Sequence, residues 1–261
     1  MSNFDRNAPA WGAGRAQQAS AVEMDQGLRS FMLGVYNNMV IGLAISALFA
    51  LGVNQLAVTN QASGVARVGG VYLTEFGRVL YTTPLMWVFA FAPLAFILFF
   101  SFRADKMSSG TARAMFFAFA AVMGVSLSTL LIRYTGASVV QVFFITAATF
   151  GGVSLYGYTT KKALSGFGSF LIMGLIGLMI ASLVNIFLAS SALQFAISAI
   201  GVLVFAGLTA WDTQRLKEMY LYSDMGPEDA AKMSVNGALS LYLNFVNMFQ
   251  MLMHLFGQKS E

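Results

Sequence analysis

The chain has 261 residues, of which 57% are hydrophobic and only 10% are charged. Soluble domains carry about 25% charged residues, so this composition excludes an ordinary soluble domain and predicts a protein of the lipid bilayer. The net charge of +4 does not indicate nucleic-acid binding, because the basic residues are scattered between apolar runs; the absence of cysteine excludes disulfides and thiolate metal sites.

The first thirty residues are polar and lack the apolar core of a secretory signal peptide. We therefore predict a mobile cytoplasmic N-terminal tail over residues 1–30, with a short helix before the first membrane span. A transmembrane domain over residues 31–257 follows, and residues 258–261 form a short C-terminal tail.

Charged residues are rare, so the number of membrane spans can be estimated from the uncharged stretches between them. Each span needs about 20 mostly apolar residues. Arg78 and Arg103 enclose 24 uncharged residues. Lys162 and Asp212 enclose 49, which is enough for two helices joined near residues 189–192. The full count predicts an all-α membrane protein with seven transmembrane helices, over about 31–53, 82–102, 113–132, 138–158, 167–188, 193–213 and 237–256.

The first and last predicted spans carry distinctive stripes. In the first, Gly42, Ser46 and Ala50 recur at four-residue spacing, which is typical of closely packed membrane helices. In the last, five polar residues fall within about 120° of one another on a helix that turns 100° per residue. This polar stripe, which we expect to face protein or water rather than lipid, consists of Ser240, Asn244, Asn247, Gln250 and His254.

The distribution of Lys and Arg predicts the orientation in the membrane. With the N-terminus inside, the inner segments carry eleven basic residues, and the outer segments carry the remaining four, which are Arg67, Arg78, Arg133 and Lys259. This difference favours a cytoplasmic N-terminus. The C-terminus is then external if the last helix crosses the membrane fully, whereas a re-entrant last helix would return it to the cytoplasm.

Three residues are candidates for a functional site near the inner surface. Arg103 ends the second span, Asp212 ends the sixth, and Asn244 lies about two turns into the seventh. Ionisable groups at membrane depth cost about 2.5–3.5 kcal/mol at a helix centre, which makes them functional candidates. Two simpler readings stay open: Arg103 and Asp212 can be boundary residues that reach water, or Asp212 can pair with Arg215 one turn later.

Catalytic motifs are missing from the sequence. It contains no HExxH segment and no thiol, and no pair of carboxylates lies at membrane depth. His254, the single histidine, has no acidic residue close to it in sequence to orient it. We therefore predict that the protein is not an enzyme, and that it needs no cofactor.

Three segments resemble the bacterial branch of the Bax inhibitor-1 family: SLYGYTTKKALSGFGSFL (154–171), AWDTQRL (210–216) and ALSLYLNFVNMF (238–249). The resemblance runs from about Arg29 to Gly257. It implies a seven-helix fold with the last, polar-striped helix in the centre, and a pH-sensitive calcium leak across the membrane. It also implies a gate in which two acids form a hydrogen-bonded pair and an arginine exchanges partners with the first acid.

Asp212 matches the first acid and Arg103 matches the arginine, but Asn244 stands where the family has its second acid. Two carboxylates in contact share a proton, because both cannot ionise cheaply. An asparagine supplies no such repulsion and can donate a hydrogen bond instead, so we expect Asp212 to stay anionic at neutral pH. No resident metal site is predicted, although Asp212 and Asn244 could make weak contacts with a transported Ca²⁺.

The sequence thus predicts a multi-pass protein of the bacterial inner membrane that passes or regulates cations through a gate at Arg103, Asp212 and Asn244. The alternative is a non-conducting regulator that binds an ATP-dependent membrane protease or another membrane complex, as the resemblance also implies. In that case the N-terminal thirty residues would be the contact surface. The sequence does not predict an oligomeric state.

Overall fold

The computed structural model describes residues 10–59, 64–68, 70–103 and 107–260. Helix α1 (Ala10–Ala57) is followed by three short strands and by seven further helices. These are α2 (Glu75–Thr82), α3 (Leu85–Arg103), α4 (Ser109–Arg133), α5 (Gly136–Thr159), α6 (Ser165–Leu188), α7 (Ser191–Tyr222) and α8 (Pro227–Phe256). Apart from the small sheet, the described part of the chain is all-α, as the sequence predicted.

The strands β1 (Val58–Thr59), β2 (Ala66–Val68) and β3 (Val71–Leu73) lie in the loop expected after the first span. They form an antiparallel sheet in the order β1-β3-β2. The Thr74 hydroxyl then accepts a hydrogen bond from Gly77 N and caps α2. Neither the sheet nor α2 was predicted from the sequence, because segments of two to eight residues are too short for a hydrophobic period to show.

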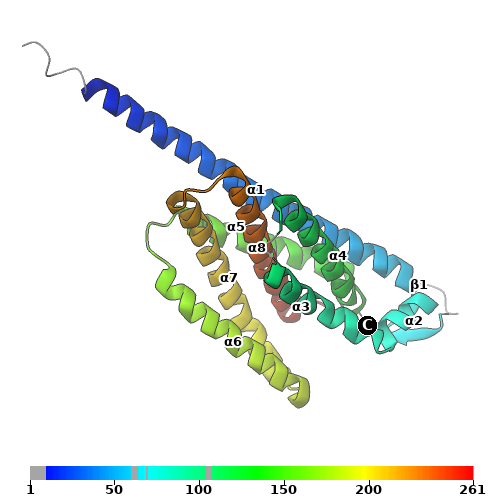
Figure 1. Ribbon diagram of the computed structural model, residues 1–261. Helices are drawn as coiled ribbons and strands as arrows, with labels where there is room; N and C mark the ends of the chain where they lie inside the picture. The colour runs from blue at the N-terminus through cyan, green and yellow to red at the C-terminus, as the bar shows by residue number, and fades with distance from the viewer. Residues whose placement is uncertain (1–9, 60–63, 69, 104–106, 261) are drawn as a thin grey trace, which may run out of the picture.

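Helix α1 begins well before the predicted start of the first span (Figure 1). Residues 10–29 are rich in alanine, glutamine and other good helix formers and contain no proline, so nothing ends the helix at the predicted boundary of residue 30. Much of the predicted tail therefore continues the helix of the first span, and residues 1–9 lie outside the described residues.

The described part of the chain contains five or six candidate membrane spans, so the predicted count of seven is not confirmed. Five helical segments are long and apolar enough to cross a membrane: Met24–Ala57, α4, α5, α6 and α7. A sixth candidate is the pair α2 and α3, which is bent by 70°. Helix α8 is not among the candidates, although it has 30 residues, because the amides and histidine of the polar stripe lower its hydropathy.

Helix α8 packs against four helices, α1, α4, α5 and α7, whereas α6 packs mainly on α7 and α3 mainly on α4 and α2. Most of the α8 side chains that are buried are apolar. Tyr242 is fully buried among the rings of Phe116 and Phe119 from α4, and its hydroxyl lies 2.6 Å from Ser46 Oγ in α1. These contacts join α1, α4 and α8 into one core.

The small-residue stripe of the first span packs closely, as predicted. A Cβ atom at Gly42 would lie only 2.7 Å from the ring of Phe116. Ser46 and Ala50 are both buried, and Ser46 Oγ donates to the carbonyl oxygen of Ala120 in α4 at 2.7 Å. Small side chains thus let α1 and α4 approach closely along the bundle.

The predicted turn between the fifth and sixth spans is confirmed at Ala189, which has a left-handed backbone with φ of 48°. Ser190 caps α7, and Asn185 Oδ1 accepts a hydrogen bond of 3.0 Å from the backbone nitrogen of Ser190. The amide nitrogen of Asn185 donates to Gln194 Oε1. Asn185, a polar residue near the end of the apolar helix α6, therefore has its hydrogen-bond partners in the turn and in the first turn of α7.

Candidate functional site

Asp212 in α7 and Asn244 in α8 lie side by side at the centre of the candidate site. Asn244 Nδ2 donates a hydrogen bond of 2.7 Å to Asp212 Oδ2. The two helices approach closely nearby, where Gly237 leaves room for Leu216: a Cβ at Gly237 would lie 2.6 Å from that side chain. Asn244 is 6% exposed and Asp212 is half-buried, so the carboxylate keeps access to one side.

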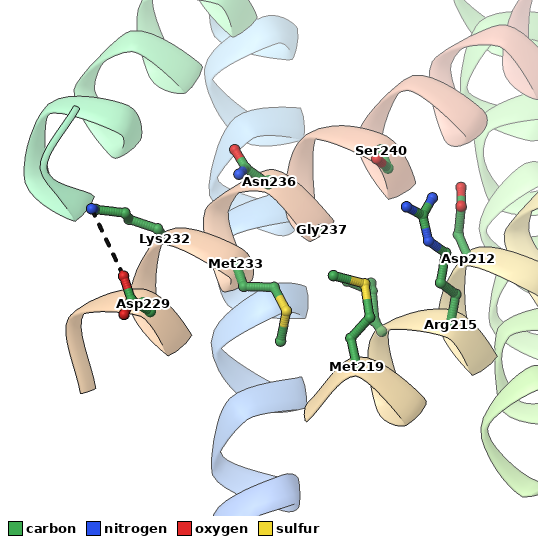
Figure 2. Close-up of a pocket in the computed structure, with 10 residues that line it drawn as sticks. Asp212, Arg215, Met219, Asp229, Lys232, Met233, Asn236, Gly237 and Ser240 are labelled. Atoms are coloured by element: carbon green, nitrogen blue, oxygen red, sulfur yellow. Dashed lines mark ion pairs between the residues drawn. The ribbon is translucent and has the colours of Figure 1, made fainter. Parts of the chain in front are cut away.

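A cavity of about 440 Å³ extends from Asp212 along the groove between α7 and α8 (Figure 2). Its lining combines two acids, two bases and several polar or apolar groups; it consists of Asp212, Arg215, Leu216, Met219, Asp229, Lys232, Met233, Asn236, Gly237 and Ser240. The exposed Asp229 and the half-buried Lys232 form an ion pair of 3.9 Å far from Asp212 (Figure 2). The cavity therefore leads from the buried Asp212–Asn244 contact toward the connection between α7 and α8.

Arg215 lies one turn after Asp212 but does not form an ion pair with it within 4 Å. The described residues contain only two such pairs, Arg78–Glu75 and Lys232–Asp229. The Arg215 guanidinium is instead placed over the ring of Trp211, 5.3 Å from its centroid. Figure 2 shows Arg215 and Asp212 on the same side of the cavity, so the arginine contributes positive charge there without neutralising the carboxylate through direct contact.

The four consecutive residues from Trp211 to Gln214 each connect α7 to a different segment. Trp211 fits against Gly168 in α6, where any Cβ would collide with the indole ring. Thr213 Oγ1 lies 3.0 Å from Ser154 Oγ in α5, which is also 2.7 Å from Tyr36 OH in α1.

Gln214 connects α7 to the segment between α5 and α6 through both ends of its side-chain amide. Its Oε1 accepts from the backbone nitrogen of Leu164 at 2.7 Å, and its Nε2 donates to the carbonyl oxygen of Lys162 at 2.8 Å. Together with the hydrogen bond that Asn244 donates to Asp212, these contacts bring together the three stretches of sequence that resemble the family. Asp212 was predicted as a site residue from the sequence, whereas the roles of Thr213 and Gln214 in the same motif were not.

The polar stripe of α8 does not face the interior as a unit. Only Asn244 is buried; Ser240 and His254 are exposed, and Asn247 and Gln250 are half-buried. Asn247 Nδ2 donates to the carbonyl oxygen of Leu243 in its own helix, and His254 Nδ1 lies 3.2 Å from Tyr134 OH. The physical reason is that the apolar side of α8, with Tyr242 and its neighbours, fills the contact with α1 and α4.

Arg103 is the last residue of α3, and its side chain lies outside the described residues. The structure thus places two of the three predicted gate residues together and leaves the third as a prediction. No group of three or more histidine or acidic side chains in the described part of the chain could hold a metal ion.

The geometry around Asp212 also bears on Ca²⁺, which takes six to eight oxygen ligands. Asn244 presents its amide nitrogen to the carboxylate, so the oxygens of the two side chains do not converge. The two side chains therefore do not form a pair of oxygen ligands for one ion.

Helix α8 extends over the same length of the bundle as α4, with contacts at both ends. At its start, the Glu228 carboxylate accepts hydrogen bonds from the backbone nitrogen and the hydroxyl of Ser109, at 2.7 and 2.8 Å. Beyond its end, Ser260 N donates a hydrogen bond to the carbonyl oxygen of Arg133, and the backbones of Lys259 and Tyr134 form an isolated antiparallel β-bridge. Ser109 and Arg133 are the first and last residues of α4, which is itself long and apolar enough to cross a membrane.

Long apolar helices and a bundle in which distant segments pack together define a multi-pass membrane protein. A family described as "Inhibitor of apoptosis-promoting Bax1" matches residues 28–261. The chain therefore belongs to the Bax inhibitor-1 family, as its motifs predicted.

Bacterial relatives match over nearly the whole chain. An uncharacterised protein of Caulobacter vibrioides is 46% identical, with 100% of both chains covered. An uncharacterised protein of Rickettsia prowazekii is 41% identical, covering 91% of this chain and 93% of its own. The inner membrane protein YbhL of Escherichia coli K12 is 40% identical over 92% of this chain and 96% of its own.

Proposed function

We propose that this protein lets cations, with Ca²⁺ as the leading candidate, cross the membrane along the cavity between α7 and α8. The observation that carries the proposal is the half-buried carboxylate of Asp212, which lines that cavity and forms no ion pair within 4 Å in the described part of the chain. An ionised group at such a position is costly unless a counter-ion approaches it, which favours a pathway for cations.

The gate lies at Asp212 and Asn244 in this proposal, with Arg103 as a third member at the end of α3. Asn244 holds Asp212 through its hydrogen bond, so opening requires that α7 and α8 separate near Gly237 or that the asparagine turns away. Because an asparagine does not titrate, this gate carries no carboxylate pair to sense pH. We therefore expect a conductance that changes little between about pH 6 and 8.

Helix α8 is the seventh span in this proposal and lies at the centre of the bundle. Its contacts with α1, α4, α5 and α7 support the central position, and its contacts at both ends of α4 support a full crossing over a re-entrant loop. The N-terminus and the α7–α8 connection then lie in the cytoplasm, in agreement with the excess of basic residues there. The relative YbhL is an inner membrane protein, which supports the bacterial inner membrane as the location of this chain.

The direct test is ion flux into liposomes that contain the purified full-length chain. We expect Ca²⁺ entry into protein-containing vesicles, and a severalfold slower entry when Asp212→Asn removes the carboxylate. Asp224→Asn is the matched control, because Asp224 is exposed in the α7–α8 connection and does not line the cavity. Equal flux in vesicles with and without protein would contradict the proposal and leave the non-conducting regulator as the better description.

A further inference from the structure

A second cavity of about 330 Å³ lies between α1, α4, α7 and α8, near the start of α8. It borders a different face of α8 from the groove that contains Asp212: Ala230, Ala231 and Ser234 line it, whereas Asp229, Lys232 and Met233 line the groove. The two cavities are therefore separate sites at the same end of the bundle.

The polar residues that line this second cavity can all donate hydrogen bonds. Five of its lining residues carry hydrogen-bond donors, and none carries a carboxylate; the five are Ser30, Asn38, Arg113, Tyr220 and Ser234. The remaining lining residues are glycine, alanine and Phe31, whose ring stacks on Tyr220 at 4.9 Å. A guanidinium with three hydroxyls and an amide, and no acid among them, is an environment for a negatively charged ligand.

Ser234 provides an independent indication that this cavity is a binding site. Its side chain is buried, with 6% exposure, and its Oγ has no hydrogen-bond partner among the described residues. Gly34 makes room for this hydroxyl, since a Cβ there would lie 3.1 Å from Ser234 Oγ. A buried polar atom without a partner costs stability, so such atoms are rare unless a ligand or solvent satisfies them.

Arg113 is also without a partner within the part of the chain that the structure describes. The two ion pairs found there involve Arg78 and Lys232, and Arg113 is exposed at the mouth of the cavity. Asn38, at 7% exposure, lies deeper on the same side of α1 as Ser30 and Gly34. The cavity therefore combines the positively charged side chain of Arg113 at its mouth with buried hydrogen-bond donors further in.

We propose that this cavity binds an oxyanion of the phosphate class, with the Arg113 guanidinium on the phosphate oxygens and the Ser234 hydroxyl as a buried donor. Arginine favours this ligand because its planar fork of N–H groups matches phosphate geometry. The volume is at the small end of ligand pockets, which span about 300–1,000 Å³, and therefore suits one phosphate group with a small attachment. The phosphate comes either from free phosphate in solution or from the headgroup of an anionic lipid.

The experiment measures thermal unfolding of the full-length protein in neutral detergent with and without inorganic phosphate, at constant ionic strength set with chloride. We expect a saturable rise in unfolding temperature with phosphate. Arg113→Gln should weaken the apparent affinity about tenfold or more, because it removes a charged hydrogen-bond partner. Arg133→Gln is the matched control, since it makes the same change at the other end of α4 and should bind phosphate as the wild type does.

Ser234→Ala separates binding from folding. Without phosphate this variant should unfold at the same or a higher temperature, because it removes a buried hydroxyl that lacks a partner. With phosphate it should lose most of the rise seen in the wild type. A destabilised protein with an unchanged phosphate effect would assign Ser234 a structural role and count against the site.

The source of the phosphate is resolved in nanodiscs of phosphatidylglycerol compared with nanodiscs of phosphatidylcholine. A stabilisation by phosphatidylglycerol that Arg113→Gln abolishes and Arg133→Gln retains would assign the site to a lipid headgroup, whereas an effect of inorganic phosphate alone would assign it to a free anion. If neither probe gives an effect that depends on Arg113, the proposal is overturned.

Discussion

Asn244 Nδ2 lies 2.7 Å from Asp212 Oδ2 and donates a hydrogen bond to it, which connects α8 to α7 at the head of the cavity between them. The resemblance to the family implies a second acid at the position of Asn244. In this chain the contact is a bond between a neutral donor and a carboxylate, and its geometry does not require a proton to be shared.

The first prediction follows from this contact. Asn244→Asp would place a second carboxylate within hydrogen-bonding distance of Asp212, and the pair would retain one proton near neutral pH because both groups cannot ionise cheaply. Ca²⁺ flux through the variant should therefore change between about pH 6 and 8, while the wild-type flux stays flat. Asn247→Asp is the control, because Asn247 bonds to its own helix. A wild type that is already steeply pH-dependent, with Asn244→Asp no different, would place the sensor elsewhere.

The second prediction concerns the Glu228–Ser109 contact between the first turns of α8 and α4. The backbone N–H and then the hydroxyl of Ser109 hold the pKa of Glu228 below its ordinary value. A carboxyl group with a lowered pKa stabilises the fold above its unfolded pKa of about 4.3, and this contribution disappears as the pH falls through the folded pKa. Glu228→Gln should therefore lower the unfolding temperature slightly at neutral pH.

The same variant should match the wild type only at a pH below the lowered pKa of Glu228 in the folded protein, where the carboxylate is protonated in both the folded and the unfolded state. Asp229→Asn is the comparison: Asp229 is the neighbouring acid, it is exposed, and its pair with Lys232 is 3.9 Å long, so we expect almost no change. Unfolding monitored by tryptophan fluorescence across this pH range measures the difference. An effect of Glu228→Gln that persists unchanged in acid would show that its carboxylate is not responsible.

The third prediction tests the close contact between α5 and α7. A Cβ at Gly157 would collide with the backbone carbonyl oxygen of Ala210, one residue before Trp211. Gly157→Ala should therefore destabilise the protein by about 1–3 kcal/mol, the usual cost of overpacking. Gly152→Ala lies in the same helix, and its Cβ would meet nothing within 4 Å. It should leave stability unchanged or raise it through helix propensity, by up to about 1 kcal/mol. Thermal unfolding of both variants gives the comparison, and equal behaviour would contradict the packing of α5 on α7.

The fourth prediction concerns topology, and the absence of native cysteine makes it simple to test. In whole cells, a membrane-impermeant thiol reagent added outside should label Gln258→Cys and should label Lys161→Cys only after permeabilisation. Lys161 lies in the α5–α6 connection, and Gln258 lies two residues beyond α8. Labelling of Gln258→Cys only after permeabilisation would mean that α8 is re-entrant, and would leave the orientation of the other helices intact.

The amino-acid pattern was enough to predict the class of the protein and the approximate positions of most of its long helices. Long uncharged stretches between residues such as Arg78 and Arg103 can be read directly, because crossing a bilayer demands about 20 apolar residues in a row. The turn at Ala189 and the close packing of Gly42 and Ser46 were predictable for similar local reasons. The family motifs predicted that Asp212 and Asn244 are neighbours, and the two side chains are joined by a hydrogen bond.

Which side of each helix is buried depends on how the helices pack, and it could not be predicted from one helix at a time. The five polar residues share one side of α8, yet Asn244 alone among them is buried, because α4 presents the rings of Phe116 and Phe119 to another side of α8. The cavity between α7 and α8 arises where these two helices pack, and the second cavity, where the Ser234 hydroxyl has no partner among the described residues, arises where α8 meets α1, α4 and α7. Hydrophobic periodicity describes one helix at a time, whereas burial depends on the shape and chemistry of the partners that cover it.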